Sequence, residues 1–194
     1  ITTLGDATIG TLNNKGTLAT VEVAGKKVAV TTLNNEGTVT VNANTELAAG
    51  TLNNKAVASS AASVTVTGKL TATTVVNEAA TAPGVTPALL SGKITVTGET
   101  SAATVSNAGT LTWNSAKDMN LKVTNSGTFS ISEACNFTGT LDNSGTATFA
   151  ETKVITGTAG TINNSGDMTV NGSLILTGTT LNIKAGKVNN VGNI

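Results

Sequence analysis

Short stretches in which apolar residues alternate with Thr or Ser recur along the whole chain. Clear examples are GTVTV at 37–41, GTLTW at 109–113, GTFSI at 127–131 and GTATF at 145–149. A period of two places apolar side chains on one face of a β-strand and polar side chains on the other. No segment of useful length shows the helical period. The pattern therefore predicts an all-β protein built from many short, half-buried strands.

A second apolar phrase that ends in Gly follows many of these stretches. It reads VTVTG at 64–68, ITVTG at 94–98, NFTG at 136–139, VITG at 154–157 and LILTG at 174–178. We interpret it as one further strand of each repeat, followed by a third, short strand. The inward positions of both phrases predict a core that contains Val39, Val41, Val64, Val66, Leu111, Phe129, Ile131, Phe137, Phe149, Ile162, Leu174 and Leu176.

A polar phrase, TLNNKGT at 11–17, returns as TLNNEGT at 32–38, TLDNSGT at 140–146 and TINNSGD at 161–167. Its second Asn defines a series with spacings of 18 to 30 residues, and Gly or Ala (Ala56 and Ala79) stands two residues after each Asn. We expect each Asn to face inward and to hydrogen-bond to its counterpart in the next repeat. The Gly is expected to permit a positive φ angle. The predicted ladder comprises Asn14, Asn35, Asn54, Asn77, Asn107, Asn125, Asn143, Asn164 and Asn190.

The recurrence of one turn with the same Asn decides between two all-β architectures. Hairpins at this spacing also build β-sandwiches and barrels, but a meander gives no reason for the same Asn at each turn. A parallel β-helix stacks equivalent residues about 4.8 Å apart, one repeat for each coil. The sequence therefore predicts one solenoid domain over 1–194, with about eight or nine coils and an Asn ladder.

One irregular stretch, at about 79–92, contains both prolines and lengthens its repeat. Residues inserted into a solenoid emerge as loops, often on the binding face. Pro83, Val85, Pro87 and Leu89 are therefore candidate ligand contacts. The alternative is a tolerated surface insertion without a function.

Composition and charge narrow the functions that the chain could perform. The 194 residues carry no net charge and include neither Arg nor His. The absence of a basic patch argues against a nucleic-acid partner, and no apolar run is long enough for membrane insertion. The acidic residues are scattered, and no cofactor site, metal site or catalytic group stands out. We therefore expect a protein that is not an enzyme.

Three individual features have a structural interpretation. Lys15, Glu36, Lys55 and Glu78 share one repeat position and are expected to form an exposed row of alternating charges. The single Cys135 allows no internal disulfide and is expected to face the core. Trp113 aligns with Val41, Ile131 and Phe149, which indicates a core position; stacking on a sugar is the alternative.

The outward Thr residues support an alternative function. Thr38 and Thr40, Thr110 and Thr112, Thr128 and Ser130, and Thr146 and Thr148 would stack in rows. Some antifreeze proteins bind ice through flat Thr arrays on β-helices. The rows are expected to be broken at 57–59 and at Ala80, and Thr is also a common choice for exposed strands.

The segments LNNKGTLATVEV and LDNSGTATF resemble the repeats of filamentous-haemagglutinin-type adhesins of bacterial surfaces. The resemblance implies a single-stranded right-handed parallel β-helix and a structural or adhesive role outside the cell. The ligand would be a host or surface glycan or protein. A carbohydrate-binding or degenerate polysaccharide-lyase-like β-helix is a second alternative.

The chain begins with Ile and has no signal peptide ahead of it. We interpret it as a segment of a longer secreted protein. Because solenoid ends need capping and neither end has an obvious polar cap, we expect flanking domains or end-to-end association.

Overall fold

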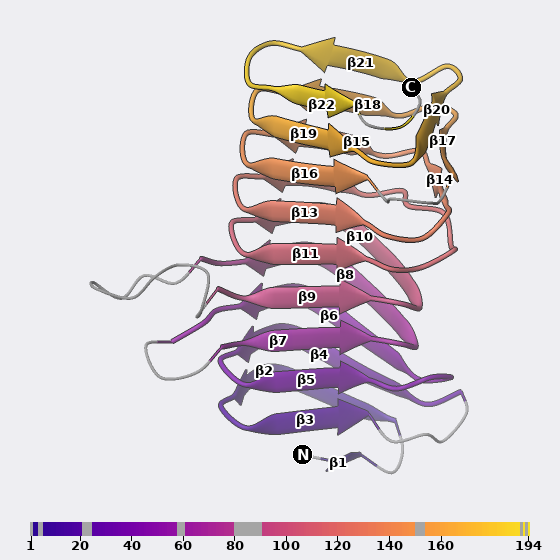
Figure 1. The fold of residues 1–194 in the computed structure, drawn as a ribbon. Coiled ribbons are helices and arrows are strands. Elements are labelled where there is room, and N and C mark those ends of the chain that lie inside the picture. The colour runs from indigo at the N-terminus through magenta and orange to yellow at the C-terminus, as the bar shows by residue number, and fades with distance from the viewer. Residues whose placement is uncertain are drawn as a thin grey trace.

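The computed structural model describes residues 2–3, 6–20, 25–57, 61–79, 91–149, 154–190, 192 and 194 of the chain. Within these residues the regular structure is entirely β-strand, and the strands pair in parallel. They stack along one axis as a parallel β-solenoid of about eight turns (Figure 1). The β-helix predicted from the sequence is therefore confirmed.

Two sheets run the length of the solenoid. Among the described residues, one sheet has ten strands: β1 (Thr2–Thr3), β3 (Thr17–Thr20), β5 (Thr38–Val41), β7 (Ser63–Val66), β9 (Lys93–Val96), β11 (Thr110–Trp113), β13 (Thr128–Ile131), β16 (Thr146–Phe149), β19 (Asp167–Val170) and β22 (Val188–Asn190). The second has nine: β2 (Ala7–Asn14), β4 (Lys27–Asn35), β6 (Glu46–Asn54), β8 (Lys69–Asn77), β10 (Glu99–Asn107), β12 (Lys122–Asn125), β15 (Thr140–Asn143), β18 (Thr161–Asn164) and β21 (Thr180–Ile183).

A small third sheet appears in the later coils of the described part of the chain. Its strands, within the described residues, are β14 (Asn136–Phe137), β17 (Val154–Gly157) and β20 (Ser173–Leu176). The second sequence phrase therefore occupies two different places. VTVTG and ITVTG form β7 and β9 of the ten-stranded sheet, whereas NFTG, VITG and LILTG belong to the third sheet. The interpretation as one recurring strand was wrong, because local alternation does not record which sheet a strand joins.

Two insertions lengthen the spacing of the Asn series after Asn54 and after Asn77. After Asn54 and Lys55 the chain leaves the coil and returns at Ala62, whose C=O accepts a hydrogen bond from the Lys93 N–H at 2.8 Å. After Asn77 and Glu78 it returns at Gly92, whose N–H donates to the Glu78 C=O at 2.9 Å.

Ala62 and Gly92 therefore occupy the turn position that the sequence assigned to Ala56 and Ala79. The C=O of Gly92 accepts the N–H of Thr110, just as the C=O of Gly109 accepts the N–H of Thr128 in the next coil. The assignment was wrong because inserted residues separate each Asn from its true turn partner.

The turn glycines are required by close packing and not by a positive φ angle. Among the described glycines, positive φ angles occur at Gly25, Gly178 and Gly186, none of which lies two residues after a ladder Asn. A Cβ atom on Gly127 would collide with the carbonyl oxygen of Gly109 in the coil below. The expected φ angle was wrong, and Gly is favoured because each turn rests directly on the backbone of the previous turn.

The core follows the predicted inward positions. All twelve predicted core residues are buried except Leu176, which is half-buried and packs against the core. Trp113 lies in register with Val96 and Ile131, as the alignment predicted, and none of its surface is exposed. The interior depends mainly on aliphatic side chains, and the few aromatic rings lie inside it.

Candidate binding surfaces

A ladder of buried Asn side chains connects the coils from the first to the eighth. In each step the Nδ2 of one Asn donates to the Oδ1 of the Asn in the next coil, at 2.6 to 2.8 Å. Each of the eight side chains is at most 6% exposed. The ladder forms because every coil places its Asn at the end of a strand of the nine-stranded sheet. Its members are Asn14, Asn35, Asn54, Asn77, Asn107, Asn125, Asn143 and Asn164.

Asn190 is not part of the ladder, contrary to the sequence prediction. It lies in β22 of the ten-stranded sheet, where it pairs with Val170, and it is exposed. The ladder position above Asn164 belongs to Ile183 of β21, which is 48% exposed. The letters NN at 189–190 match the turn phrase, but these two residues belong to β22 of the ten-stranded sheet.

A second Asn column lies on the outer face of the nine-stranded sheet. Asn34 donates to Asn13 and Asn53 donates to Asn34, each at 2.8 Å. Nearer the C-terminal end, Asn163 donates to Asp142 at 2.6 Å. Sequence reasoning missed this column, although the first Asn of the NN pair in the turn phrase was its signal.

Two columns of alternating charge border the early strands of the nine-stranded sheet. The expected column contains ion pairs of 3.7 Å between Lys15 and Glu36 and between Lys55 and Glu78. The other column was missed: it places Lys27, Glu46, Lys69 and Glu99 in register, with pairs of 3.1 Å for Lys27 and Glu46 and 3.8 Å for Lys69 and Glu99. These carboxylates form ion pairs with Lys side chains of neighbouring coils.

Asp6 begins the second charge column. Its Oδ1 accepts the backbone N–H of Lys27 at 2.9 Å, and its other oxygen lies 3.6 Å from the ammonium of Lys26. The hydrogen bond from Lys27, and after it the charge of Lys26, lower the pKa of Asp6 below its ordinary value.

The outer side of the ten-stranded sheet is an ordered array of hydroxyl groups, which we call the hydroxyl face. Its central column is uninterrupted over seven strands: Thr40, Thr65, Thr95, Thr112, Ser130, Thr148 and Thr169. A parallel column runs through Thr38, Ser63, Lys93, Thr110, Thr128, Thr146 and Asp167.

The central column is continuous where the sequence predicted breaks, whereas Lys93 interrupts the hydroxyls of the second column. Of these positions, residues 58, 59 and Ala80 lie outside the described residues, and Val57 lies in none of the strands. Ser63 and Thr65 take the row positions in one coil, and Lys93 and Thr95 take them in the next. The predicted breaks were therefore wrong for the central column, and the second column is interrupted at Lys93 instead of Ala80.

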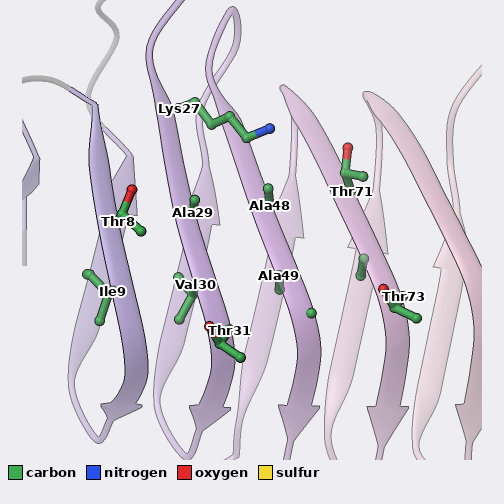
Figure 2. A pocket seen from close by; sticks show the side chains of 12 residues that line it. Thr8, Ile9, Lys27, Ala29, Val30, Thr31, Ala48, Ala49, Thr71 and Thr73 are labelled. Atoms are coloured by element: carbon green, nitrogen blue, oxygen red, sulfur yellow. The ribbon is translucent and has the colours of Figure 1, made fainter.

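A shallow groove lies on the outer side of β2, β4, β6 and β8. Thr8, Ala29, Ala48 and Thr71 form one row across it, and Figure 2 shows their side chains in line. Its volume is about 440 Å³. A second hollow of about 560 Å³ shares Ala72 and Thr73 with it and extends to later coils. Small residues line much of this groove, among them Ala29, Ala48 and Gly50.

Cys135 and Trp113 are interior residues. Cys135 is 7% exposed, and burial, followed by the charge of Asp118, raises the pKa of its thiol to about 11. A thiol that holds its proton so strongly is a poor nucleophile. The indole of Trp113 is fully buried, so the alternative of stacking on a sugar is wrong. Its N–H finds no acceptor, which is a local cost in the core.

The candidate contacts Pro83, Val85, Pro87 and Leu89 lie outside the described residues. No group of three or more acidic, His or Cys residues is arranged to hold a metal ion within the described residues. In the same residues, no helix is long and apolar enough to cross a membrane.

Comparisons of the chain with protein-family models, with curated proteins and with solved structures found no match.

Proposed function

We propose that the chain is a structural and adhesive segment of a secreted bacterial cell-surface protein, without catalytic activity. The observation that carries this proposal is the connection of successive coils by a buried Asn ladder. Eight coils at about 4.8 Å each give a rod on the order of 35–40 Å long. A rod whose coils are fixed in register holds a contact surface at a constant distance from its point of attachment.

The ligand of this segment is proposed to be a glycan or protein of a host or neighbouring surface. The groove over β4 and β6 suits an extended chain, because its floor is made of Ala29, Ala48 and Gly50 and its sides carry Thr hydroxyls. The insertion at 79–91 is a second contact in this proposal. Flanking domains or end-to-end association would cover the apolar Ile183, which is half exposed.

A glycan and host-protein array tests the ligand with three forms of the protein. The parent chain is compared with Ala48→Phe, which fills the groove, and with a chain that lacks 79–91. Binding that one of the two variants loses supports the proposal and identifies the contact. Thr161→Phe, on the same sheet but away from the groove, is the matched control. A blank array with the parent chain contradicts an adhesive role.

The proposed location on the cell surface is tested separately. An antibody raised against the folded chain should label intact cells of the source organism without permeabilisation. Labelling that requires permeabilised cells would contradict the placement on the cell surface.

A further inference from the structure

We infer that the hydroxyl face binds the surface of ice, a function beyond the proposed adhesive role. The hydroxyl face is regular along the axis of the solenoid. Seven Thr or Ser residues follow one another without interruption from Thr40 to Thr169. Hydroxyls repeat about 4.8 Å along the column and about 6.6–6.8 Å across to the neighbouring column. Both distances are close to repeats of the oxygen lattice in ordinary ice.

The chemistry of the face matches water in a lattice. Each hydroxyl donates one hydrogen bond and accepts two, as a water molecule on a crystal surface requires. Thr also presents a methyl group beside the hydroxyl. Its branched Cβ restricts χ1, and the side chains of the central column are half-buried between neighbours. The array is therefore ordered before binding, which lowers the entropic cost of association.

The ligand must itself be periodic in two dimensions. A single hydroxyl contact is weak in water, so affinity requires many contacts made at once on a rigid support. Crystalline polysaccharides are periodic as well, but their recognition relies on exposed aromatic rings. Trp113, Phe129 and Phe149, whose strands form this face, all point inward and are at most 1% exposed. The face therefore favours ice.

The outer face of the nine-stranded sheet provides an internal comparison for the hydroxyl face. Its Thr column, which includes Thr74 and Thr104, is interrupted at Lys122. The neighbouring column contains Val76 and Asp142. Its Asn side chains are bonded to each other at 2.8 Å, whereas the bonds on the hydroxyl face, from Ser130 to Thr112 and from Ser63 to Thr38, are longer at 3.3 Å. The two faces thus have a similar Thr content but differ in regularity, which gives matched positions for substitution.

Thermal hysteresis and ice-crystal shaping test the inference with the purified chain. The parent should separate the freezing and melting points and produce faceted crystals. The double substitution Thr112→Tyr with Thr148→Tyr should reduce hysteresis on the order of tenfold, because two bulky rings hold the hydroxyl face away from the ice surface. Tyr is a favourable residue on an exposed strand, and circular dichroism checks the fold. Thr51→Tyr with Thr140→Tyr, on the nine-stranded sheet, should leave hysteresis unchanged.

A gain of activity gives a test that unfolding cannot mimic. Lys93 and Asp167 are the charged residues in the second hydroxyl column among the described strands. Lys93→Thr should raise hysteresis by about twofold because it extends the uncharged array. Absence of hysteresis and shaping in the parent overturns the inference. Equal losses on the two faces, or binding to crystalline cellulose or chitin without any effect on ice, overturn it as well.

Discussion

A buried amide side chain stabilises a protein only when its donors and its acceptor are both satisfied. Asn125 shows how the ladder meets this condition. Its Oδ1 accepts from Asn107, and its Nδ2 donates to Asn143 at 2.6 Å and to the C=O of Gly127 at 3.1 Å. The amide groups of the ladder are thus paired with one another and with the turn backbone, and each ladder residue depends on its neighbours in two coils.

The substitution Asn143→Ala should lower the free energy of unfolding by about 1–3 kcal/mol, because it leaves amide groups of Asn125 and Asn164 without a partner. Asn143 is 2% exposed and bonds to both neighbours. The loss is measured by urea denaturation. Asn171→Ala, outside the ladder and half-buried, should have little effect. Equal losses for the two variants would contradict the role of the ladder.

Cys135 should resist iodoacetamide at pH 8 in the folded protein and react once the chain is unfolded. Its pKa is raised from 9.0 to about 11, so the unfolded thiol ionises first as the pH rises. The contribution of this thiol to stability is therefore complete below pH 9.0 and is lost as the pH rises to about 11. Labelling is followed by mass spectrometry. Rapid labelling under native conditions would show that the thiol is accessible, against the structure.

At the scale of the element, the turn after each strand of the nine-stranded sheet is the unit that repeats. Where no insertion is present, the turn consists of the ladder Asn, one polar or small residue and a Gly that lies against the turn below. Each insertion leaves this unit after its second residue and rejoins it at Ala62 or Gly92. The insertions are therefore additions to an intact turn.

Deletion of 79–91 should be tolerated because Glu78 joined to Gly92 recreates the turn at 35–37. The N–H of Gly92 already donates to the C=O of Glu78 at 2.9 Å, so the two ends lie close together. We expect a change in the free energy of unfolding within about 1 kcal/mol, since shortening a loop lowers its closure entropy only slightly. Thermal unfolding measures it. Deletion of 104–106, inside β10, is the control that should unfold the coil.

The sequence allowed the strands, the core and most of the ladder to be predicted, because alternation and the spacing of Asn are local signals. Asn143 is an example, since its whole turn phrase is contiguous. The prediction for Asn190 was wrong because this residue lies in β22, which pairs with β19 and not with β18. The continuity through Thr65 and Thr95 was missed for a related reason. Which residues become neighbours depends on the register between coils. An insertion changes the sequence spacing, so this register cannot be predicted from the local sequence pattern.

At the scale of the whole molecule, side-chain columns fix how each coil sits on the next. The second charge column alternates Lys27, Glu46 and Lys69. A shift of register by one coil would place like charges opposite each other. Exposed ion pairs contribute little to stability one at a time, so their effect is mainly on the choice of register.

The substitution Glu46→Lys should destabilise the protein by about 0.5–1 kcal/mol, because Lys27 and Lys69 would then flank a third ammonium group. The loss should shrink at 1 M salt, where charges are screened. Urea denaturation at low and high salt measures both effects. Glu46→Gln removes the attraction without adding repulsion, so its loss should be smaller and less dependent on salt. Identical behaviour of the two variants would show that the column has no influence on register.

The hydrogen bonds of the buried ladder all have the same direction, from the Nδ2 of one coil to the Oδ1 of the coil that follows it in sequence. Amide dipoles aligned in this way add, as peptide dipoles do along an α-helix. Each bond also polarises the next, and the three bonds from Asn77 to Asn143 are the shortest, at 2.6 Å. The solenoid therefore has an electrical polarity along its axis. The ladder begins with the carbonyl oxygen of Asn14 and ends with the amide hydrogens of Asn164, so the two ends of the rod present opposite partial charges.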